Sequence, residues 1–275
     1  MCRVLEVSKS GYYAYKSRPV SAGRISNDAL LIDIRRVHLE HKQRVGSPRI
    51  WRELRNAGRR CSKNRIAHLM REAGIRARGK RKFRATTDSR HTRAVWPNVL
   101  AREFKVAAPD RAYVSDITYI WTQEGWLYLA TVLDLYSRMV VGSRMGSRIT
   151  DDLTCGALSQ AILRRNPGAG LIVHSDRGSQ YASDAFKGVL SRHEFVGSMS
   201  RKGDCWDNAV AESFFHTLKV ELVHGKIYRT REEAMREIFE YIEVYYNRKR
   251  MHSTLGYMSP YEYERQRALT LQTVH

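Results

Sequence analysis

Three carboxylates, Asp116, Asp176 and Glu212, occur where acidic side chains can hold metal ions. Asp116 interrupts residues 113–120, a β-branched and aromatic run that predicts a buried strand, where an ionised carboxylate is costly without a nearby cation. Asp176 follows the apolar run 171–173 and precedes a turn-rich segment. Glu212, separated from Asp176 by thirty-five residues, falls in the first turns of a predicted helix. Such oxygen ligands suit Mg²⁺.

This trio predicts phosphoryl transfer. Phosphodiester chemistry needs charge compensation at the attacking and leaving oxygens, which two metal ions roughly 3.5–4 Å apart supply. On this hypothesis Asp116 bridges the ions, while Asp176 and Glu212 each complete the site of one. No Ser, Cys or His nucleophile is then required, because water or a DNA 3′-hydroxyl attacks.

Structural explanations compete with this hypothesis. Asp176 could cap a turn, because its neighbours are turn formers, and Glu212 could pair with His216 or Lys219. Asp116 is the hardest to explain structurally, because strand interiors disfavour Asp. Four other carboxylates are rival candidates. Asp134 ends a predicted strand, and helix N-capping accounts for Asp151, Asp152 and Asp207.

The positive charge lies mostly in the first third of the chain. The 275 residues carry a net charge of +20. Residues 1–98 hold 25 Lys/Arg against 7 Asp/Glu, whereas residues 99–275 hold 23 against 21. This asymmetry predicts a polyanion-binding N-terminal region and a near-neutral globular domain. The four scattered cysteines exclude a C-x-x-C zinc site, and no apolar run is long enough to span a membrane.

Three short helices are expected within residues 28–75. The first covers 28–41, the second starts with Ser47 as N-cap and Pro48 at the first helical position, and Ser62 caps the third. They predict a helix-turn-helix-like unit, and a small basic bundle that holds only the DNA backbone is the alternative. Its candidate DNA-binding residues are Arg52, Arg55, Lys63 and Arg65.

Residues 76–98 form a basic linker that could follow a phosphate backbone or serve as a solvated tether. Its candidate DNA contacts are Arg78, Lys80, Arg81, Lys82 and Arg84.

The pattern changes to strands after Ala112. Strands are expected at 113–121, 126–133 and 139–145, followed by a helix over 151–165. Further strands at 171–174 and 195–198 alternate with helices near 182–192, 208–222 and 231–247. A meander followed by alternating helix and strand predicts an α/β fold, a ribonuclease-H-like mixed sheet with flanking helices. The expected division is a basic helical region 1–75, a linker 76–98, a catalytic core 99–230 and a C-terminal helix and tail 231–275.

Longer motifs surround the three acids and carry a family resemblance. The stretches 116–119 (DITY), 174–181 (HSDRGSQY) and 207–215 (DNAVAESFF) resemble the D,D-35-E core of bacterial insertion-sequence transposases. The match is best to the second-frame protein of the IS-three family, which is similar to retroviral integrases. Residues 246–260, 10–14 and 46–50 also resemble that family.

The resemblance implies a DNA transposase that cuts and joins transposon ends. It implies Asp116, Asp176 and Glu212 as catalytic and metal-binding residues, with two Mg²⁺ ions for which Mn²⁺ can substitute. Its partners would be double-stranded DNA, in terminal repeats and target, and further copies of the chain. An upstream-frame partner or fusion segment is also implied, because members of this family are often made as a frameshift fusion that supplies an extra DNA-binding, dimerising segment. The expected location is the bacterial cytoplasm, at the nucleoid.

Several residues near the motifs are secondary candidates for DNA contact: Lys219, Arg177, His174, Arg248 and Arg250. His174 could instead be a histidine at a strand end whose hydrogen bonds are satisfied within the fold. Arg248 and Arg250 could belong to an ordinary basic helix terminus. Trp51, Trp96, Trp121 and Trp126 are expected to pack rather than to stack on bases. A structure-specific nuclease of the same fold and a catalytically silent DNA-binding regulator remain alternatives to the transposase.

Overall fold

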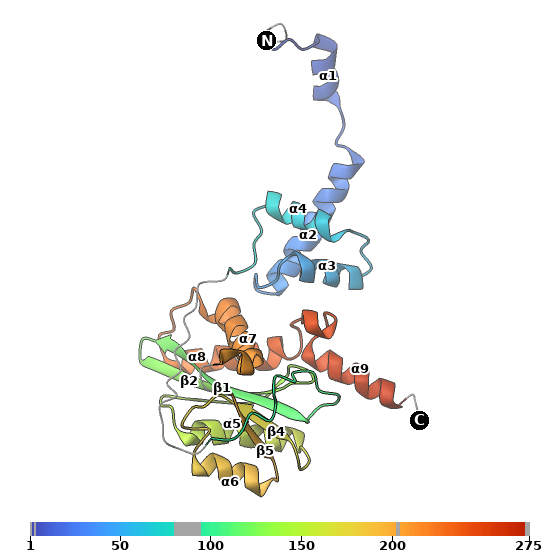
Figure 1. Ribbon diagram of the computed structural model, residues 1–275. Helices are drawn as coiled ribbons and strands as arrows, with labels where there is room; N and C mark the ends of the chain where they lie inside the picture. The colour runs from blue at the N-terminus through green and yellow to red at the C-terminus, as the bar shows by residue number, and fades with distance from the viewer. Residues whose placement is uncertain (1, 3, 80–94, 202–203, 273–275) are drawn as a thin grey trace. The chain divides into compact units, whose positions relative to one another are not determined.

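The protein divides into two compact units, residues 1–79 and 80–275, in a computed structural model (Figure 1). The structure describes all residues except 1, 3, 80–94, 202–203 and 273–275. For residues 205, 271 and 272 it describes the backbone but not the side chain. Four of the predicted linker contacts, Lys80, Arg81, Lys82 and Arg84, therefore lie outside the described residues.

The N-terminal unit is helical. Its helices are α1 (Lys9–Ser17), α2 (Ala22–Glu40), α3 (Ser47–Asn56) and α4 (Lys63–Glu72). Ser62 caps α4 as predicted, because its side chain accepts the backbone N–H of Arg65. The predicted N-cap of α3 is wrong by one residue. Gly46 is the cap and Ser47 is already helical, because the first helical hydrogen bonds of α3 end on the carbonyl of Gly46.

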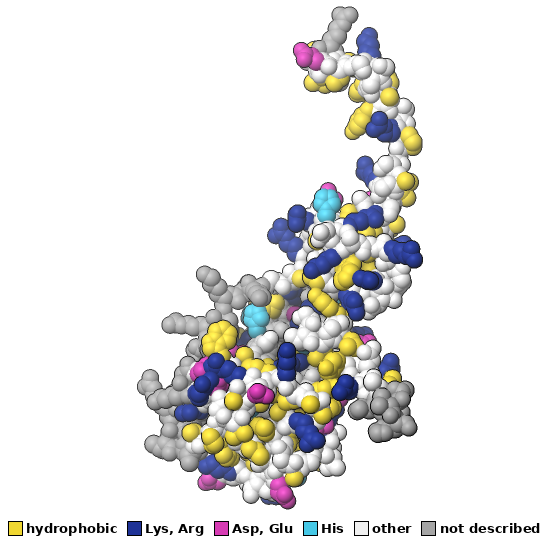
Figure 2. Space-filling model, turned by 45° about the vertical axis from the view of Figure 1, so that its right-hand side comes forward, with side chains coloured by type: hydrophobic (Ala, Val, Ile, Leu, Met, Phe, Trp, Pro, Cys, Tyr) yellow, Lys and Arg dark blue, Asp and Glu magenta, His cyan; other side chains and the backbone are white. Residues whose placement is uncertain are grey.

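The helices α2, α3 and α4 share one apolar core. Leu30, Ile34, Ile50, Leu54 and Ile66 are buried within it, whereas no residue of α1 is buried. Lys and Arg side chains are spread over the face of this unit that Figure 2 shows, and acidic side chains are few there. The many basic and few acidic side chains on this face agree with the basic composition of the N-terminal part of the chain.

The second unit contains a five-stranded mixed sheet. Its strands are β1 (Ala112–Thr122), β2 (Gly125–Asp134), β3 (Val140–Gly146), β4 (Ile172–Ser175) and β5 (Val196–Met199). They lie in the order β3-β2-β1-β4-β5, in which β1, β2 and β3 are antiparallel and β4 and β5 run parallel to β1. This topology confirms the predicted ribonuclease-H-like fold. Because β1 is the central strand, it has a neighbour on both sides.

Helices cover both faces of the sheet (Figure 1). On one face lie α5 (Asp151–Arg165) and α6 (Asp184–Arg192), and on the other α7 (Ala209–Leu218) and α8 (Arg231–Glu240). Helix α5 reaches β3 closely at Gly142, where an added Cβ would lie 2.1 Å from the carbonyl oxygen of Ala157. Two apolar cores result, and the one under α7 supports the helix that carries Glu212.

Two predicted helices end differently from expectation. The helix expected over 208–222 passes into a π-helical segment η2 (Lys219–Val223), and that expected over 231–247 passes into η3 (Tyr241–Tyr246). The chain then forms a short turn η4 (Ser253–Leu255) and α9 (Pro260–Gln272). Residue periodicity does not reveal such π turns, because they insert one residue per turn without changing residue type.

The C-terminal segment packs against the sheet. Asn247 donates from its amide to the carbonyl of Val140 and accepts from the backbone N–H of that residue, both at 3.0 Å. Arg165 of α5 binds Glu264 of α9 at 2.7 Å. Among the described helices, none is both long and apolar enough to cross a membrane.

Candidate active site

The register of two parallel strands brings the two aspartates together. Ser115 of β1 pairs with Ser175, the last residue of β4. Asp116, the next residue of β1, and Asp176, the first residue after β4, therefore emerge at adjacent positions. Neighbouring strands lie about 4.8 Å apart, which is close enough for two carboxylates to share a cation.

The start of α7 lies against β1 next to Asp116. The side-chain amide of Asn208, which immediately precedes α7, donates to the carbonyl of Ser115 at 3.4 Å. Glu212 lies in the first turn of α7, and its charge is one of those that act on Asp116. The structure thus brings the three predicted carboxylates into one electrostatic neighbourhood.

The electrostatics of Asp116 reveal a crowded acidic site. Burial raises the pKa of Asp116 well above its ordinary value, and the charges of Asp176 and Glu212 raise it further. The backbone N–H of Ile117, which donates to Asp116 Oδ1 at 2.8 Å, and the ammonium of Lys219 act in the opposite direction. Burial also raises the pKa of Glu212. Neutralising these acids by protons is the alternative to neutralising them by a cation.

Asp176 is held by a tight turn. The backbone N–H of Gly178 donates to Asp176 Oδ1 at 2.9 Å, so Asp176 caps a turn, as the structural alternative predicted. A Cβ at position 178 would lie 3.0 Å from that same oxygen. Glycine therefore leaves one face of the carboxylate uncrowded.

A second polar layer lies behind the aspartates. The Ser115 hydroxyl donates to the carbonyl of Thr131 at 2.9 Å and lies 2.9 Å from the Tyr181 hydroxyl. Burial and the charges of Asp116 and Asp176 raise the pKa of Tyr181, so its hydroxyl stays protonated. This layer was not predicted from the sequence, because Ser115 and Tyr181 meet only through the fold.

The donor set fits hard divalent cations. Three carboxylates from rigid elements, with Asp116 between the other two in electrostatic reach, match the oxygen ligands that Mg²⁺ takes. Across the part of the chain that the structure describes, no three His, Cys, Asp or Glu side chains gather around a single point. The buried Oδ1 of Asn208, which has no hydrogen-bond partner among the described residues, is a further oxygen at this edge.

Lys219 lies beside the acids but inside the protein. It begins the π-helical segment η2 and is only 7% exposed. Its ammonium lies 4.9 Å from the centre of the Tyr119 ring. Burial lowers the pKa of Lys219, and the charge of Asp116 raises it. Its predicted contact with a DNA phosphate stays a prediction.

Two predicted DNA contacts need correction. His174 is fully buried, with Nδ1 2.9 Å from the Ser198 hydroxyl and Nε2 3.2 Å from the Ser200 hydroxyl. Its ring therefore links β4 to β5 and to the residue that follows β5. Arg250 is buried in an ion pair with Glu221 at 2.9 Å. Neither side chain can reach DNA without unpacking, and the structural alternative holds for both.

The other secondary candidates remain predictions with defined surroundings. Arg177 donates from Nε to the carbonyl of Ser200 at 2.7 Å, and the guanidinium of exposed Arg248 lies 5.9 Å from the Tyr261 ring centre. In the N-terminal unit Arg55 and Lys63 are exposed, whereas Arg52 and Arg78 are half-buried.

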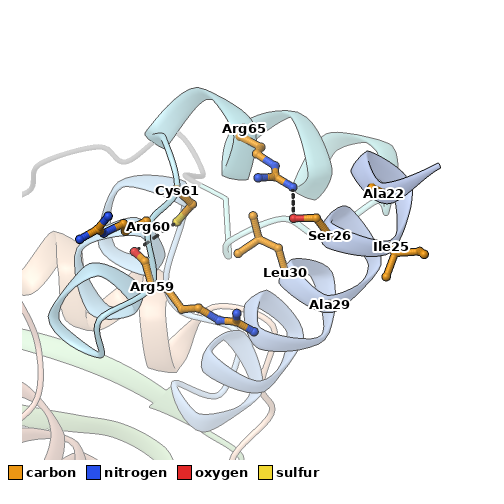
Figure 3. A pocket seen from close by; sticks show the side chains of 9 residues that line it. All are labelled: Ala22, Ile25, Ser26, Ala29, Leu30, Arg59, Arg60, Cys61 and Arg65. Atoms are coloured by element: carbon orange, nitrogen blue, oxygen red, sulfur yellow. Dashed lines mark hydrogen bonds between the residues drawn. The ribbon is translucent and has the colours of Figure 1, made fainter.

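The guanidinium of Arg65 makes hydrogen bonds within its own unit. It donates to Ser26 of α2 at 2.8 Å (Figure 3). It also donates to Asn27 of α2 at 2.8 Å. A hollow of about 330 Å³ lies beside it, between α2 and the segment that joins α3 to α4. Part of the guanidinium is therefore used to hold α4 against α2.

Asp207 has a different role from the expected N-cap. It is fully buried and accepts hydrogen bonds from Arg201, Arg102 and Asn98. The Arg201 guanidinium, with help from Arg102, holds the pKa of Asp207 well below its usual range. Asp204 caps the short turn η1 (Cys205–Asn208) instead. The signal for this cluster lies in residues about a hundred positions apart, which no local pattern joins.

Comparison with known proteins gives consistent matches. Family models described as "Integrase core domain" match residues 106–205 and 212–268, and one described as "HTH-like domain" matches residues 26–83. The chain is 44% identical over 260 residues to the "Insertion element IS600 uncharacterized 31 kDa protein" of Shigella sonnei, covering 94% of this chain and 96% of that protein.

It is also 43% identical over 272 residues to "Transposase InsF for insertion sequence IS3A" of Escherichia coli K12, covering 96% of this chain and 92% of that protein. Among solved structures, the HTLV-2 integrase catalytic core in complex with magnesium is similar, with a TM-score of 0.42 and 13% identity. That likeness covers 57% of this chain and 97% of the other.

Proposed function

The chain belongs to the family of insertion-sequence transposases that includes InsF of IS3A, and from this premise we propose that Asp116, Asp176 and Glu212 carry its DNA cleavage and joining. The protein is a DNA transposase with an integrase core, a class that transfers polynucleotides. The observation that carries the assignment to these residues is the pairing of Ser115 with Ser175, which sets the two aspartates side by side. The action of Asp176 and Glu212 on the pKa of Asp116 supports it.

In the proposed reaction, an oxygen nucleophile attacks a phosphorus atom of the DNA backbone. Water serves in cleavage and a DNA 3′-hydroxyl in joining; a new P–O bond forms as the bond to the leaving 3′-oxygen breaks. Asp116 and Asp176 would hold one divalent ion, and Asp116 and Glu212 the other, with Mg²⁺ as the natural metal and Mn²⁺ as its substitute. Such ions compensate the charge that develops on the attacking and leaving oxygens.

The chain's own groups prepare this site. The Gly178 N–H orients Asp176, and the amide of Asn208 ties the start of α7 to the strand that carries Asp116. Lys219 offsets part of the negative charge around Asp116. The helix-turn-helix-like unit would bind the terminal repeats, and pairing two DNA ends would require at least two copies of the chain. Such work on DNA would be done at the bacterial nucleoid.

The test uses labelled DNA that carries the ends of the insertion sequence, a target plasmid and Mg²⁺ or Mn²⁺. The wild-type chain should cut and join these ends. Asp116→Asn should reduce joining by at least about three orders of magnitude, because metal-ion charge stabilisation contributes several kcal/mol, while DNA affinity stays close to wild type. Asp184→Asn is the matched control, because that exposed aspartate lies on α6, away from the site.

Each alternative gives its own outcome in this assay. Hydrolysis without joined products would indicate a nuclease, and binding without either reaction would indicate a silent regulator. Joining that survives in Asp116→Asn would remove this residue from the active site.

A further inference from the structure

Trp206 is the most exposed of the five tryptophans, although tryptophan is ordinarily well packed. It is 69% exposed, against 57% for Trp121 and 42% for Trp126. Those two rings contact each other, with centres 4.8 Å apart across the hairpin of β1 and β2. Trp51 donates from its indole to the carbonyl of Cys61 at 3.0 Å, and Trp96 packs on Gly197. The folded chain thus gives the exposed Trp206 ring the least packing.

The backbone that carries Trp206 is firmly held. Asp204, two residues before it, accepts the Trp206 backbone N–H at 3.3 Å and pairs with Arg102 and with Arg201. Asp207, one residue after it, is fully buried among the same two arginines. The two aspartates on either side fix the turn, so the exposed indole belongs to a fixed turn rather than to a loose tail. Fixed aromatic groups bind with little loss of entropy.

Trp206 is also close in sequence to residues that contact the strand of Asp116 or carry Glu212. Asn208, two residues on, is 3% exposed and bonds to the carbonyl of Ser115, the neighbour of Asp116. Glu212 follows within the first turn of α7. The turn η1 is therefore the link between the strand that bears the first aspartate and the helix that bears the glutamate.

We propose that Trp206 stacks on an unpaired DNA base next to the phosphodiester that reacts. The proposal rests on the function assigned above to Asp116, Asp176 and Glu212. An indole offers a flat apolar face to which any base can stack, and stacking on an aromatic side chain is sequence-tolerant. Inside a duplex the faces of the bases are covered by their neighbours, so the indole selects DNA that is opened or frayed at the reacting end. Stacking offsets part of the cost of unpairing that end.

The experiment compares two DNA probes of one sequence. The first is a fully paired duplex, and the second is frayed by a few mismatched nucleotides at one end, with 2-aminopurine in the unpaired strand. The full-length chain carries Asp116→Asn in every sample, so that the probes stay uncut. The second substitution is Trp206→Ala, Trp206→Phe or, as the matched control, Trp121→Ala, which removes another exposed indole.

With Trp206 intact, binding should quench the 2-aminopurine emission. Trp206→Ala should abolish the quenching and weaken binding to the frayed probe by roughly ten-fold more than to the paired one, as expected for the loss of one aromatic–base stack. Trp206→Phe should keep most of both effects, and Trp121→Ala should behave like the parent. The folded state should persist, because the hydrogen bonds that fix the turn do not use the indole; circular dichroism checks this.

Three results would overturn the proposal. The first is quenching that persists in Trp206→Ala. The second is an equal loss of affinity for the frayed probe in Trp206→Ala and Trp121→Ala. The third is a Trp206→Ala variant that loses self-association in sedimentation but keeps its preference for the frayed probe. The last result would assign the indole to a contact between copies. A failure of the active-site assignment would show separately, as joining by Asp116→Asn with Trp206 intact.

Discussion

At the residue scale, the site depends on carboxylates that repel one another. Asp116 has two acidic neighbours and one nearby ammonium, so its charge is under-compensated in the chain alone. At the proposed metal site, an ion would displace a proton that burial and repulsion hold in place, so metal affinity should rise with pH. Lys219 moderates this effect, and its burial beside Tyr119 keeps the amino group at the acids.

His174 has the clearest pH-linked role of a single residue. Burial lowers its pKa to about 4, from an ordinary value of 6.5. Because the folded-state pKa lies below the unfolded one, the neutral ring stabilises the protein above pH 6.5. This contribution is lost as the pH falls towards 4, and the difference in pKa corresponds to roughly 3 kcal/mol.

We expect His174→Gln to be less stable than wild type at pH 7. The gap should narrow by roughly 3 kcal/mol between pH 7 and pH 4, because only the wild type must protonate a buried imidazole. Denaturant unfolding at a series of pH values measures the gap. His193→Gln, at the half-buried end of α6, is the control and should show little narrowing. A gap that stays constant for His174→Gln would show that its ring is not buried in the neutral form.

At the scale of elements, a buried polar cluster joins the two π-helical segments. Arg250 binds Glu221 of η2 with Nε and a terminal nitrogen, at 3.0 and 2.9 Å. The Tyr241 hydroxyl of η3 donates to the same carboxylate at 2.8 Å. Since η2 starts at Lys219, this cluster fixes the helical element that carries both Lys219 and Glu212. The arginine thus supports the site from within, which explains its burial.

Removal of one partner of this pair should be costly. Arg250→Met should destabilise the protein by about 3–5 kcal/mol, because the Glu221 carboxylate stays buried without its cation. The double variant with Glu221→Leu should recover much of this loss, since no buried charge remains. Thermal unfolding of the two variants and wild type measures this. Equal stability of the single and double variants would argue against a coupled ion pair. Arg248→Met is the matched control, because that side chain is exposed.

At the scale of the whole molecule, the two units differ in their balance of basic and acidic side chains. The N-terminal unit, residues 1–79, carries 19 basic and 6 acidic side chains, whereas residues 80–275 carry 29 basic and 22 acidic side chains. A strongly basic module attracts DNA through its phosphates whatever the sequence, and the acidic pocket would otherwise repel the same backbone. Separate units let each charge pattern persist without cancelling the other.

DNA affinity should therefore fall steeply with salt. The logarithm of the binding constant should decrease linearly with the logarithm of salt concentration, with a slope of about −0.9 for each phosphate contacted. The variant with Arg55→Gln and Lys63→Gln, both exposed in the N-terminal unit, should flatten the slope by roughly 2. A control with Lys187→Gln and Arg192→Gln on α6 should keep the wild-type slope. An unchanged slope in the first variant would exclude Arg55 and Lys63 as phosphate contacts.

The sequence by itself determined the features that depend on near neighbours. The residue types of 113–121 and 126–133 predicted β1 and β2, Ser62 marked the start of α4, and the helix expected over 151–165 is α5. Motifs around Asp116, Asp176 and Glu212 indicated the family. Such signals arise from contacts within a strand or one helical turn, so they can be read along the chain.

Only the tertiary structure decided which polar groups are exposed and which are enclosed. His174 and Arg250 are of residue types that commonly contact DNA, but both side chains are buried. Trp206 is of a type that commonly packs in a core, but its side chain is exposed. The pairing of Ser115 with Ser175, and the cluster around Asp207, join segments tens of residues apart. Burial and strand register depend on these distant contacts, because a side chain's surroundings are supplied by whichever elements pack over it.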